Sequence, residues 1–169
     1  EKYGEFWGDA KIVKEAFDAY YRTEIGRIAQ AFNFGLKDST SNIIRLQNFL
    51  INCKNPGEVF LETTGNYYFR KRYREMKRKY DSLLERAKES IFGDLIFFVY
   101  GGDLSISSDI SNELSYNYPK KYICVAYKRE GIVNVSLRGK GVRAILEKVL
   151  NRLEHATGGG HEDAVGARV

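Results

Sequence analysis

The chain of 169 residues is 43% hydrophobic and 29% charged, and it contains only two prolines. This composition excludes a disordered or fibrous protein and is sufficient for one ordinary domain or two small ones. The net charge is +5, and most of the basic excess lies in residues 1–90. A basic excess favours a polyanionic partner such as nucleic acid, although mild positive charge is also common in proteins that bind none.

The cysteines and the apolar runs indicate the compartment. Cys53 and Cys124 are far apart in the chain and form no CxxC motif, so two reduced, buried thiols are expected. There is no signal peptide, and no apolar run approaches the roughly 18 residues of a membrane span. The apolar run over residues 95–100 has only the length of a strand. We therefore expect a soluble, cytoplasmic protein that does not contact a membrane.

The first half of the chain has helical periodicity. A helix is expected over residues 9–32, with Asp9 as its N-cap and a possible break at Gly26. Ser39 is expected to cap a second helix, which ends at the turn formed by residues 55–57. These helices would form the start of a helical connector.

A third, long helix is expected over about residues 58–90. Apolar side chains recur at alternating steps of four and three, which predicts a face that docks against neighbouring helices rather than a separate coiled coil. The basic side chains on its other faces include Arg70, Arg72, Arg74, Lys77, Arg78 and Lys79. Because aromatic residues 67–69 adjoin these cations, the helix is either a nucleic-acid track or an ordinary solvated face.

The second half alternates strands and helices, which predicts an α/β domain with a mixed sheet flanked by helices. The expected elements are a doubly buried strand over 95–100, a helix to about 118, strands over 121–129 and 132–138, a helix over 142–155, a glycine loop and a final strand. We therefore expect a connector over residues 1–90 and a second domain over residues 91–169. Because the chain stops inside the expected last strand, we expect the second domain to be C-terminally truncated.

Two motifs in the second domain point to anion binding. Ser136-x-Arg138 lies at the end of an alternating strand, which delivers a fork-shaped cation to the strand end. Further on, Gly158, Gly159 and Gly160 precede His161. A glycine loop can present backbone N–H groups as an anion nest, and a helical turn beginning at His161 would add more. The alternative is a glycine-rich helix end beside a chance histidine.

Together, these motifs resemble the DHH-associated domain, the C-terminal module of the DHH phosphoesterase superfamily. The resemblance covers roughly residues 91–169, and Ala164-Val165 replaces the two alanines that many relatives carry there. Residues 102–107 (GDLSIS) and 136–139 (SLRG) are most similar to archaeal RecJ-type single-strand exonucleases. The helices of the first half resemble, more loosely, the connector that follows the catalytic domain of those proteins.

The resemblance implies that catalysis and substrate binding belong to different domains. The superfamily cleaves phosphodiesters with two metal ions, here expected to be Mn²⁺ or Mg²⁺, held by an N-terminal domain whose Asp-His-His signature this chain lacks. We therefore expect no cofactor in this chain, and whether it belongs to an active enzyme stays open. By resemblance, Arg138 contacts phosphate, while residues 158–160 and His161 face the substrate near the metals. Ser136 either adds a hydroxyl contact or holds Arg138 in place.

Three functions are compatible with this resemblance. The first is the part of a DNA replication or repair exonuclease that binds single-stranded DNA or RNA, and the basic helix favours it. The second is the substrate-binding module of a phosphodiesterase that acts on short oligonucleotides or cyclic dinucleotides. The third is a non-catalytic scaffold that is bound to the GINS replication complex.

Overall fold

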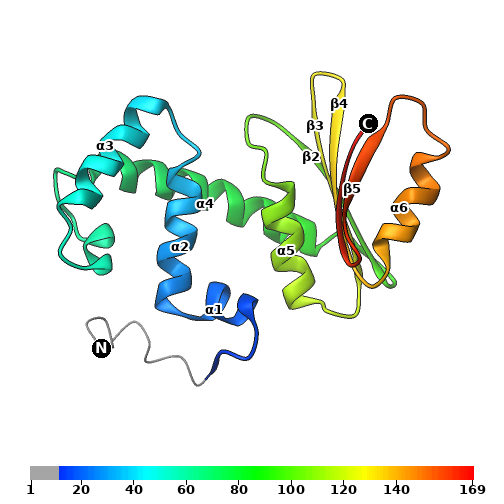
Figure 1. The fold of residues 1–169 in the computed structure, drawn as a ribbon, viewed down its shortest axis with the longest axis horizontal. Coiled ribbons are helices and arrows are strands. Elements are labelled where there is room, and N and C mark those ends of the chain that lie inside the picture. The colour runs from blue at the N-terminus through cyan, green and yellow to red at the C-terminus, as the bar shows by residue number, and fades with distance from the viewer. Residues whose placement is uncertain (1–11) are drawn as a thin grey trace. The chain divides into compact units, whose positions relative to one another are not determined.

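The computed structural model describes residues 12–169, which form a helical part followed by a mixed sheet with helices on both faces (Figure 1). The expected α/β class and architecture are therefore confirmed. The chain divides into two compact units, residues 1–79 and residues 80–169. The sequence analysis placed the domain boundary after residue 90. The observed division instead lies inside helix α4 (Tyr67–Lys88), which contributes to both units.

Unit 1 contains two short helices where one was expected, α1 (Ala16–Arg22) and α2 (Glu24–Gly35). They are separated at Thr23, whose backbone is extended and whose hydroxyl donates to the Ala19 carbonyl (2.6 Å) and accepts from the Gly26 amide (3.1 Å). The predicted break at Gly26 is therefore wrong. Gly26 lies inside α2, where an added Cβ would clash with the Ala19 carbonyl oxygen, so the glycine permits close approach. The expected N-cap Asp9 lies outside the described residues.

The next two elements show where local sequence signals succeed and fail. Helix α3 (Thr40–Ile51) begins after Ser39, whose hydroxyl accepts from the Asn42 amide (3.4 Å), as predicted. The long helix expected over residues 58–90 is shorter at its start, because a 3₁₀ helix, η2 (Pro56–Phe60), and a loop precede α4. This part of unit 1 packs around a buried cluster that comprises Ala31, Leu46, Val59 and Phe69.

Asn66 holds this loop in place. Its side chain is 1% exposed, and its amide nitrogen donates to the carbonyl oxygens of Val59 (3.1 Å) and Leu61 (2.8 Å). Its amide oxygen accepts from Thr63 Oγ1 (3.1 Å) and from Arg70 Nε (2.9 Å). One buried amide therefore satisfies polar groups from η2, the loop and α4, which explains why the chain turns here instead of continuing as a helix.

Unit 2 is built on a six-stranded sheet with the order β1-β2-β3-β4-β6-β5. Its strands are β1 (Ile91–Phe92), β2 (Leu95–Gly101), β3 (Tyr122–Arg129), β4 (Ile132–Arg138), β5 (Thr157–His161) and β6 (Ala164–Arg168). Strands β2 and β3 are parallel, and every other pair is antiparallel, so the sheet is mixed as expected. β6 lies between β4 and β5.

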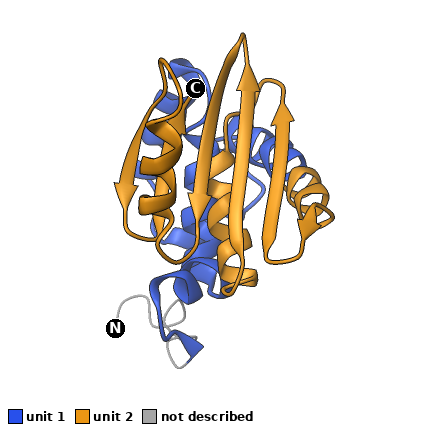
Figure 2. Cartoon of the chain, turned by 90° about the vertical axis from the view of Figure 1, so that its right-hand side faces the viewer, with its two compact units in different colours: residues 1–79 blue, residues 80–169 orange. Residues whose placement is uncertain are grey.

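One helix packs on each face of this sheet. Helix α5 (Ser107–Asn117) follows β2 and packs on β3 and β4, while α6 (Val142–Leu150) packs on β5 and β6 at the opposite face. Figure 2 shows α6 in front of the sheet, with β2 and β3 uncovered on that side. Helix α6 ends at Leu150, five residues before the end of the helix that was expected over residues 142–155. No helix among residues 12–169 has the length and apolar character needed to cross a membrane.

Strand β2 is buried on one face only, although its apolar run predicted burial on both. Ile96, Phe98 and Tyr100 are buried, whereas the alternate side chains Leu95, Phe97 and Val99 are 39–47% exposed. The exposed side chains share the face on which α6 packs, because Phe97 pairs with Cys124 and Cys124 pairs with Leu137, which contacts the α6 cluster. A helix that covers only the β5 side of this face leaves β2 open.

Replacing Asn66 by alanine tests the role assigned to this amide. The change removes donors and acceptors from buried backbone and side-chain partners, so we expect unfolding free energy to fall by about 2–3 kcal/mol. Urea unfolding followed by circular dichroism measures the loss. Asn48→Ala, which removes an exposed amide from α3, is the matched control and is expected to change little. Equal stability of the two variants would contradict the assigned role.

Candidate functional site

The three glycines before His161 lie in strand β5 and not in a loop. Gly158, Gly159 and Gly160 pair with Ala167, Gly166 and Val165 of β6. The predicted anion nest is therefore wrong, because successive N–H groups of an extended strand point in opposite directions and do not converge. The predicted helical turn at His161 is also absent from this segment, where residues 162–163 form the turn of a β-hairpin.

The glycines divide into two kinds by the face they occupy. Gly158 and Gly160 lie on the face covered by α6, and a Cβ would lie 2.7 Å from the Gly166 carbonyl oxygen at the first and 2.5 Å from that of Ala164 at the second. Gly160 also has a φ of 145°, which favours glycine. Gly159 lies on the opposite face, where a Cβ would meet nothing within 4 Å. Only Gly159 therefore borders open space.

Strand pairing brings the two predicted motifs into one row. Arg138 pairs with Ala164 across β4 and β6, and Ala164 pairs with His161 across β6 and β5. Directly paired residues point to the same face of a sheet, and each strand spacing is about 4.8 Å. The Cα atoms of Arg138 and His161 are thus roughly 10 Å apart on one face. In the adjacent row, Ser136, Gly166 and Gly159 occupy that same face.

Helix α5 covers only part of this face. It contacts β4 through the Ser107 and Ser136 hydroxyls, which are 3.0 Å apart and buried. Gly166 is exposed, although strands flank it on both sides. We call the uncovered surface over Gly166 and Gly159 the glycine floor. Because neither residue has a side chain, a ligand can approach the backbone of β6 and β5 closely at this point.

Arg138 is held at one side of the glycine floor. Its Nε donates to Asn112 Oδ1 of α5 (2.7 Å), and one terminal nitrogen donates to the carbonyl oxygens of Leu137 (2.7 Å) and Val165 (3.2 Å). Ser136 is bonded to Ser107 and not to Arg138, so the idea that Ser136 itself holds the guanidinium finds no contact among the described residues. Asn112 fills that role, and the sequence offered no signal for it.

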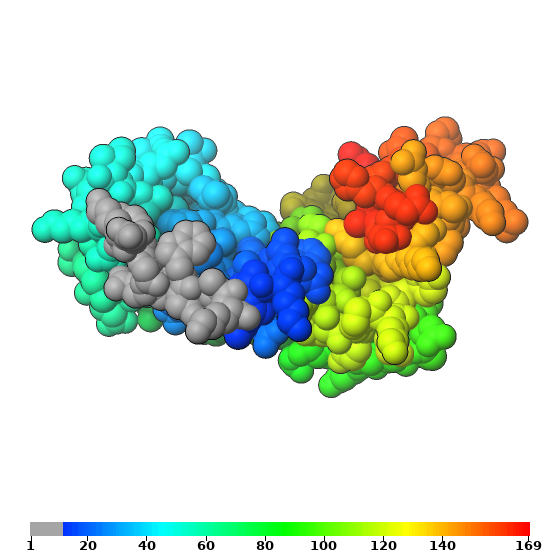
Figure 3. Space-filling view, turned by 60° about the horizontal axis from the view of Figure 1, so that its bottom comes forward, coloured from blue at the N-terminus to red at the C-terminus, as the bar shows by residue number. Residues whose placement is uncertain are grey.

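His161 and the acidic turn behind it differ in their surroundings. The His161 side chain is exposed and has no hydrogen bond or ion pair within residues 12–169. Asp163 Oδ1 instead accepts from the Gly141 amide (2.8 Å), and the Glu162 carbonyl accepts from the Arg143 amide (3.1 Å) at the start of α6. Figure 3 shows the red hairpin tip against the yellow-orange segment that leads into α6. The Asp163 carboxylate is therefore hydrogen-bonded to the backbone just before α6.

The predicted cations of α4 separate into two groups. Arg70 bonds to Glu62 (2.8 Å) and Asn66, while Arg72 donates to the Lys37 carbonyl at the end of α2 (2.8 and 3.1 Å). These two arginines stabilise unit 1. Arg74 and Arg78 are exposed and Lys77 is half-buried. A surface hollow of about 580 Å³ is lined by Tyr67, Lys71, Tyr73, Arg74, Glu75, Lys77 and Arg78. Lys79 is exposed at the end of unit 1. We call the hollow the α4 basic hollow.

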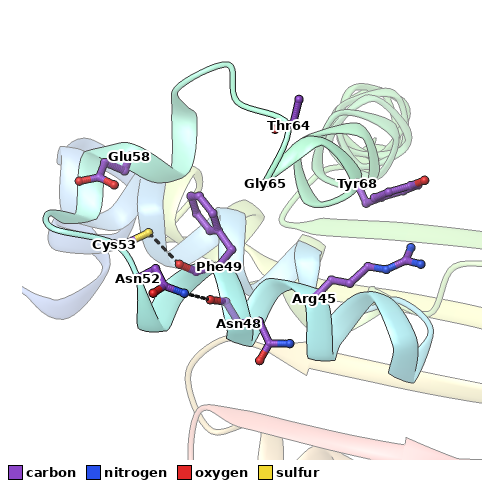
Figure 4. A pocket seen from close by; sticks show the side chains of 9 residues that line it. All are labelled: Arg45, Asn48, Phe49, Asn52, Cys53, Glu58, Thr64, Gly65 and Tyr68. Atoms are coloured by element: carbon purple, nitrogen blue, oxygen red, sulfur yellow. Dashed lines mark hydrogen bonds between the residues drawn. The ribbon is translucent and has the colours of Figure 1, made fainter.

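A second hollow of about 500 Å³ in unit 1 was not predicted. The Arg45 guanidinium lies over the Tyr68 ring, 4.7 Å from its centroid, and the amides of Asn48 and Asn52 belong to the same lining. Figure 4 shows Arg45 on α3 close to Tyr68 on α4. These residues carry no recognisable motif, because they come from separate helices that only the fold brings together.

His, Cys, Asp and Glu side chains are the remaining groups that could bind a metal ion or react. Among residues 12–169, no three His, Cys, Asp or Glu side chains lie in an arrangement that could hold a metal ion. Cys53 and Cys124 form no disulfide. Burial raises the pKa of the Cys124 thiol to about 11, which disfavours the reactive thiolate at neutral pH.

Comparison with known proteins identifies the fold. No protein-family profile and no curated protein matches the chain. Among solved structures, it is similar to Mg²⁺-bound RecJ from Thermus thermophilus, with a TM-score of 0.54 and 12% identity over 94% of this chain and 24% of RecJ. It is also similar to the pGpG-specific phosphodiesterase PggH from Vibrio cholerae, with a TM-score of 0.51 and 12% identity over 96% of this chain and 61% of PggH. The chain thus shares its fold with parts of both proteins.

Single alanine replacements separate the two kinds of glycine. We expect Gly160→Ala to lower the melting temperature by several degrees, because it adds about 1–3 kcal/mol of backbone strain and a steric clash. Gly159→Ala is expected to leave the melting temperature unchanged or slightly higher, since its Cβ meets open space. Thermal unfolding by circular dichroism makes the comparison. A loss at Gly159 as large as that at Gly160 would show that the glycine floor is packed.

Proposed function

We propose that this chain is the nucleic-acid-binding part of a DHH-superfamily phosphoesterase, and that it holds the phosphodiester backbone of a single strand on the glycine floor. The observation that carries this proposal is the row in which Arg138 and His161 share one face on either side of Ala164. A cation fixed at one side, an imidazole at the other and two glycines in the adjacent row match the shape and charge of a phosphodiester.

The shared fold and the motifs support the same family. RecJ and PggH are similar to the chain along nearly all its length. The Ser-x-Arg and Gly-Gly-Gly-His motifs resemble those of the DHH-associated domain, and Arg138, Gly159 and His161 from these motifs lie on one face of the sheet. Because the chain spans 24% of RecJ and 61% of PggH, hydrolysis belongs to the proposal for a larger protein. Mn²⁺ or Mg²⁺ would be held there by residues outside this chain.

Within this chain the contribution is binding and orientation. The bonds from Asn112 and two backbone carbonyls fix the Arg138 guanidinium before any ligand arrives, which reduces the entropy lost on binding. His161, which has no partner within the described residues, can donate a hydrogen bond from its ring to a phosphate oxygen. Gly159 and Gly166 leave room for the sugar-phosphate chain. A strand held at these points presents its adjoining phosphodiester in a fixed direction.

Two substrate classes remain candidates for this site. The fold likeness to PggH, which is a pGpG-specific phosphodiesterase, favours a short substrate. The α4 basic hollow favours a longer single strand, because its cations and Tyr67 provide charge and a stacking ring in a separate unit. We favour the single-stranded DNA or RNA of a RecJ-type exonuclease in replication or repair, since a dinucleotide needs no second basic surface.

Two substitutions on the floor test the proposed site. His161→Ala removes a donor that holds nothing else within the described chain, so we expect binding of a single-stranded oligonucleotide to weaken about tenfold. Gly159→Val adds a strand-compatible side chain that obstructs the floor, with a comparable or larger expected loss. Fluorescence anisotropy measures both affinities, and melting curves verify that each variant is folded. Wild-type affinity in both folded variants would contradict the proposed site.

The salt dependence of binding tests the α4 basic hollow. Each phosphate contact adds about 0.7 to the slope of log affinity against log salt for a single strand. Replacing Lys71, Lys77 and Arg78 with glutamine is therefore expected to lower the slope by up to about 2 for a long single strand. The charge-matched control replaces Lys54, Lys120 and Lys148. Equal slopes for the two triple variants would identify the hollow as an ordinary solvated surface.

A further inference from the structure

A second arginine lies on the same face as the proposed site. Counting only rows on that face, it is two rows beyond the row of Arg138 and His161. Arg168 of β6 pairs with Asn134 of β4 on one side and with Thr157 of β5 on the other. Since alternate residues of a strand share a face, Arg168 points to the same side as Gly166 and Ala164. Its side chain is therefore on the face of Arg138 and opposite to α6.

Arg168 is exposed and has no hydrogen bond or ion pair within the part of the chain that the structure describes. The rows that contain it and the proposed site hold no carboxylate. Their nine members are Arg138, Ala164 and His161, then Ser136, Gly166 and Gly159, then Asn134, Arg168 and Thr157. None of these nine positions supplies the acidic partner that a surface arginine commonly has.

The nearest helix keeps its carboxylates away from this face. Tyr80 donates to the Glu113 carboxylate, so this side of α5 is directed to α4 within unit 2. Asp109 lies one helical turn before Glu113 and shares that side. Asn112 of α5 instead meets Arg138, and Ser108 lies one turn before it. The side of α5 that borders β4 is therefore polar and uncharged.

The two arginines lie at opposite ends of the glycine floor. Arg138 is level with Ala164, and Arg168 follows Ala164 by four positions, so the backbone positions of the two arginines are separated by about 13 Å along the strand direction. Gly166, with Gly159 beside it, lies midway. Asn112 and two backbone carbonyls hold the Arg138 guanidinium at its own end of the floor. The arrangement suits two phosphates of one extended chain whose connecting sugar and base lie over the glycines.

We propose that Arg168 forms a second phosphate subsite, flanked by the Asn134 amide and the Thr157 hydroxyl, so that the site selects ligands with at least two phosphates along one strand. This inference rests on the proposed function, because it extends the site of Arg138 and His161. It assigns that site to extended oligonucleotides in preference to mononucleotides, and it aligns the bound strand with β6.

The test compares ligand length and substitution in the full 169-residue chain. Thymidine 5′-monophosphate and 5′-phosphorylated tri- and hexathymidylate compete against a labelled single strand. Arg168→Gln is expected to weaken the trimer and the hexamer about tenfold and to leave the mononucleotide unchanged, because only longer ligands reach Arg168. For Arg168→Gln, the slope of log affinity against log salt for the hexamer is expected to fall by about 0.7. Arg168→Lys keeps the charge and is expected to retain most of the affinity.

Two further variants distinguish the failure of this inference from that of the proposed function. His161→Ala is expected to weaken all three ligands, and Arg152→Gln, an exposed arginine beyond α6, is the control that is expected to weaken none. If His161→Ala weakens binding while Arg168→Gln behaves like Arg152→Gln, the second subsite is contradicted and the proposed site stands. Equal losses for the mononucleotide and the hexamer at Arg168 also contradict it. If His161→Ala changes nothing, both proposals fail.

Discussion

The insertion of β6 between β4 and β5 is the contact on which the candidate site depends. It places Arg138, Ala164 and His161 in one row, although these residues come from three strands and from opposite sides of α6 in the chain. The acidic turn that joins β5 to β6 fixes this arrangement from the outside, since Asp163 accepts from the Gly141 amide ahead of α6. A change of register by one residue would move His161 and Arg138 to opposite faces.

The glycines of β5 connect the stability of the hairpin with the candidate site. Gly158 and Gly160 let β5 lie close to β6 on the face covered by α6, and an added Cβ at either would strike the backbone of β6. Gly159, between them, has no such constraint and leaves the other face open. The same three residues therefore maintain the hairpin on one side and expose its backbone on the other. A site formed in this way is rigid, because the strands that bear it are paired through their backbones.

The sequence was sufficient for the fold class, the alternation of strands and helices, and the two motifs of the site, because each has a local pattern. It was not sufficient for the geometry. Glycine has a low strand propensity, which favoured a loop at residues 158–160 until tertiary pairing overrode that propensity. The role of Asn112 and the position of Arg168 depend on strand order. The use of Arg72 at the Lys37 carbonyl joins residues 35 positions apart and has no local signal.

Amide chemical shifts during titration with a 5′-phosphorylated trithymidylate test the central claim most directly. If the ligand lies on the glycine floor, the largest changes will occur at Gly159, His161 and Gly166 and will extend towards Arg168. Amides of α6, such as those of Ile145 and Val149, will change little because α6 lies on the opposite face. Changes confined to α6 and the exposed face of β2, with β5 and β6 unaffected, would contradict the account.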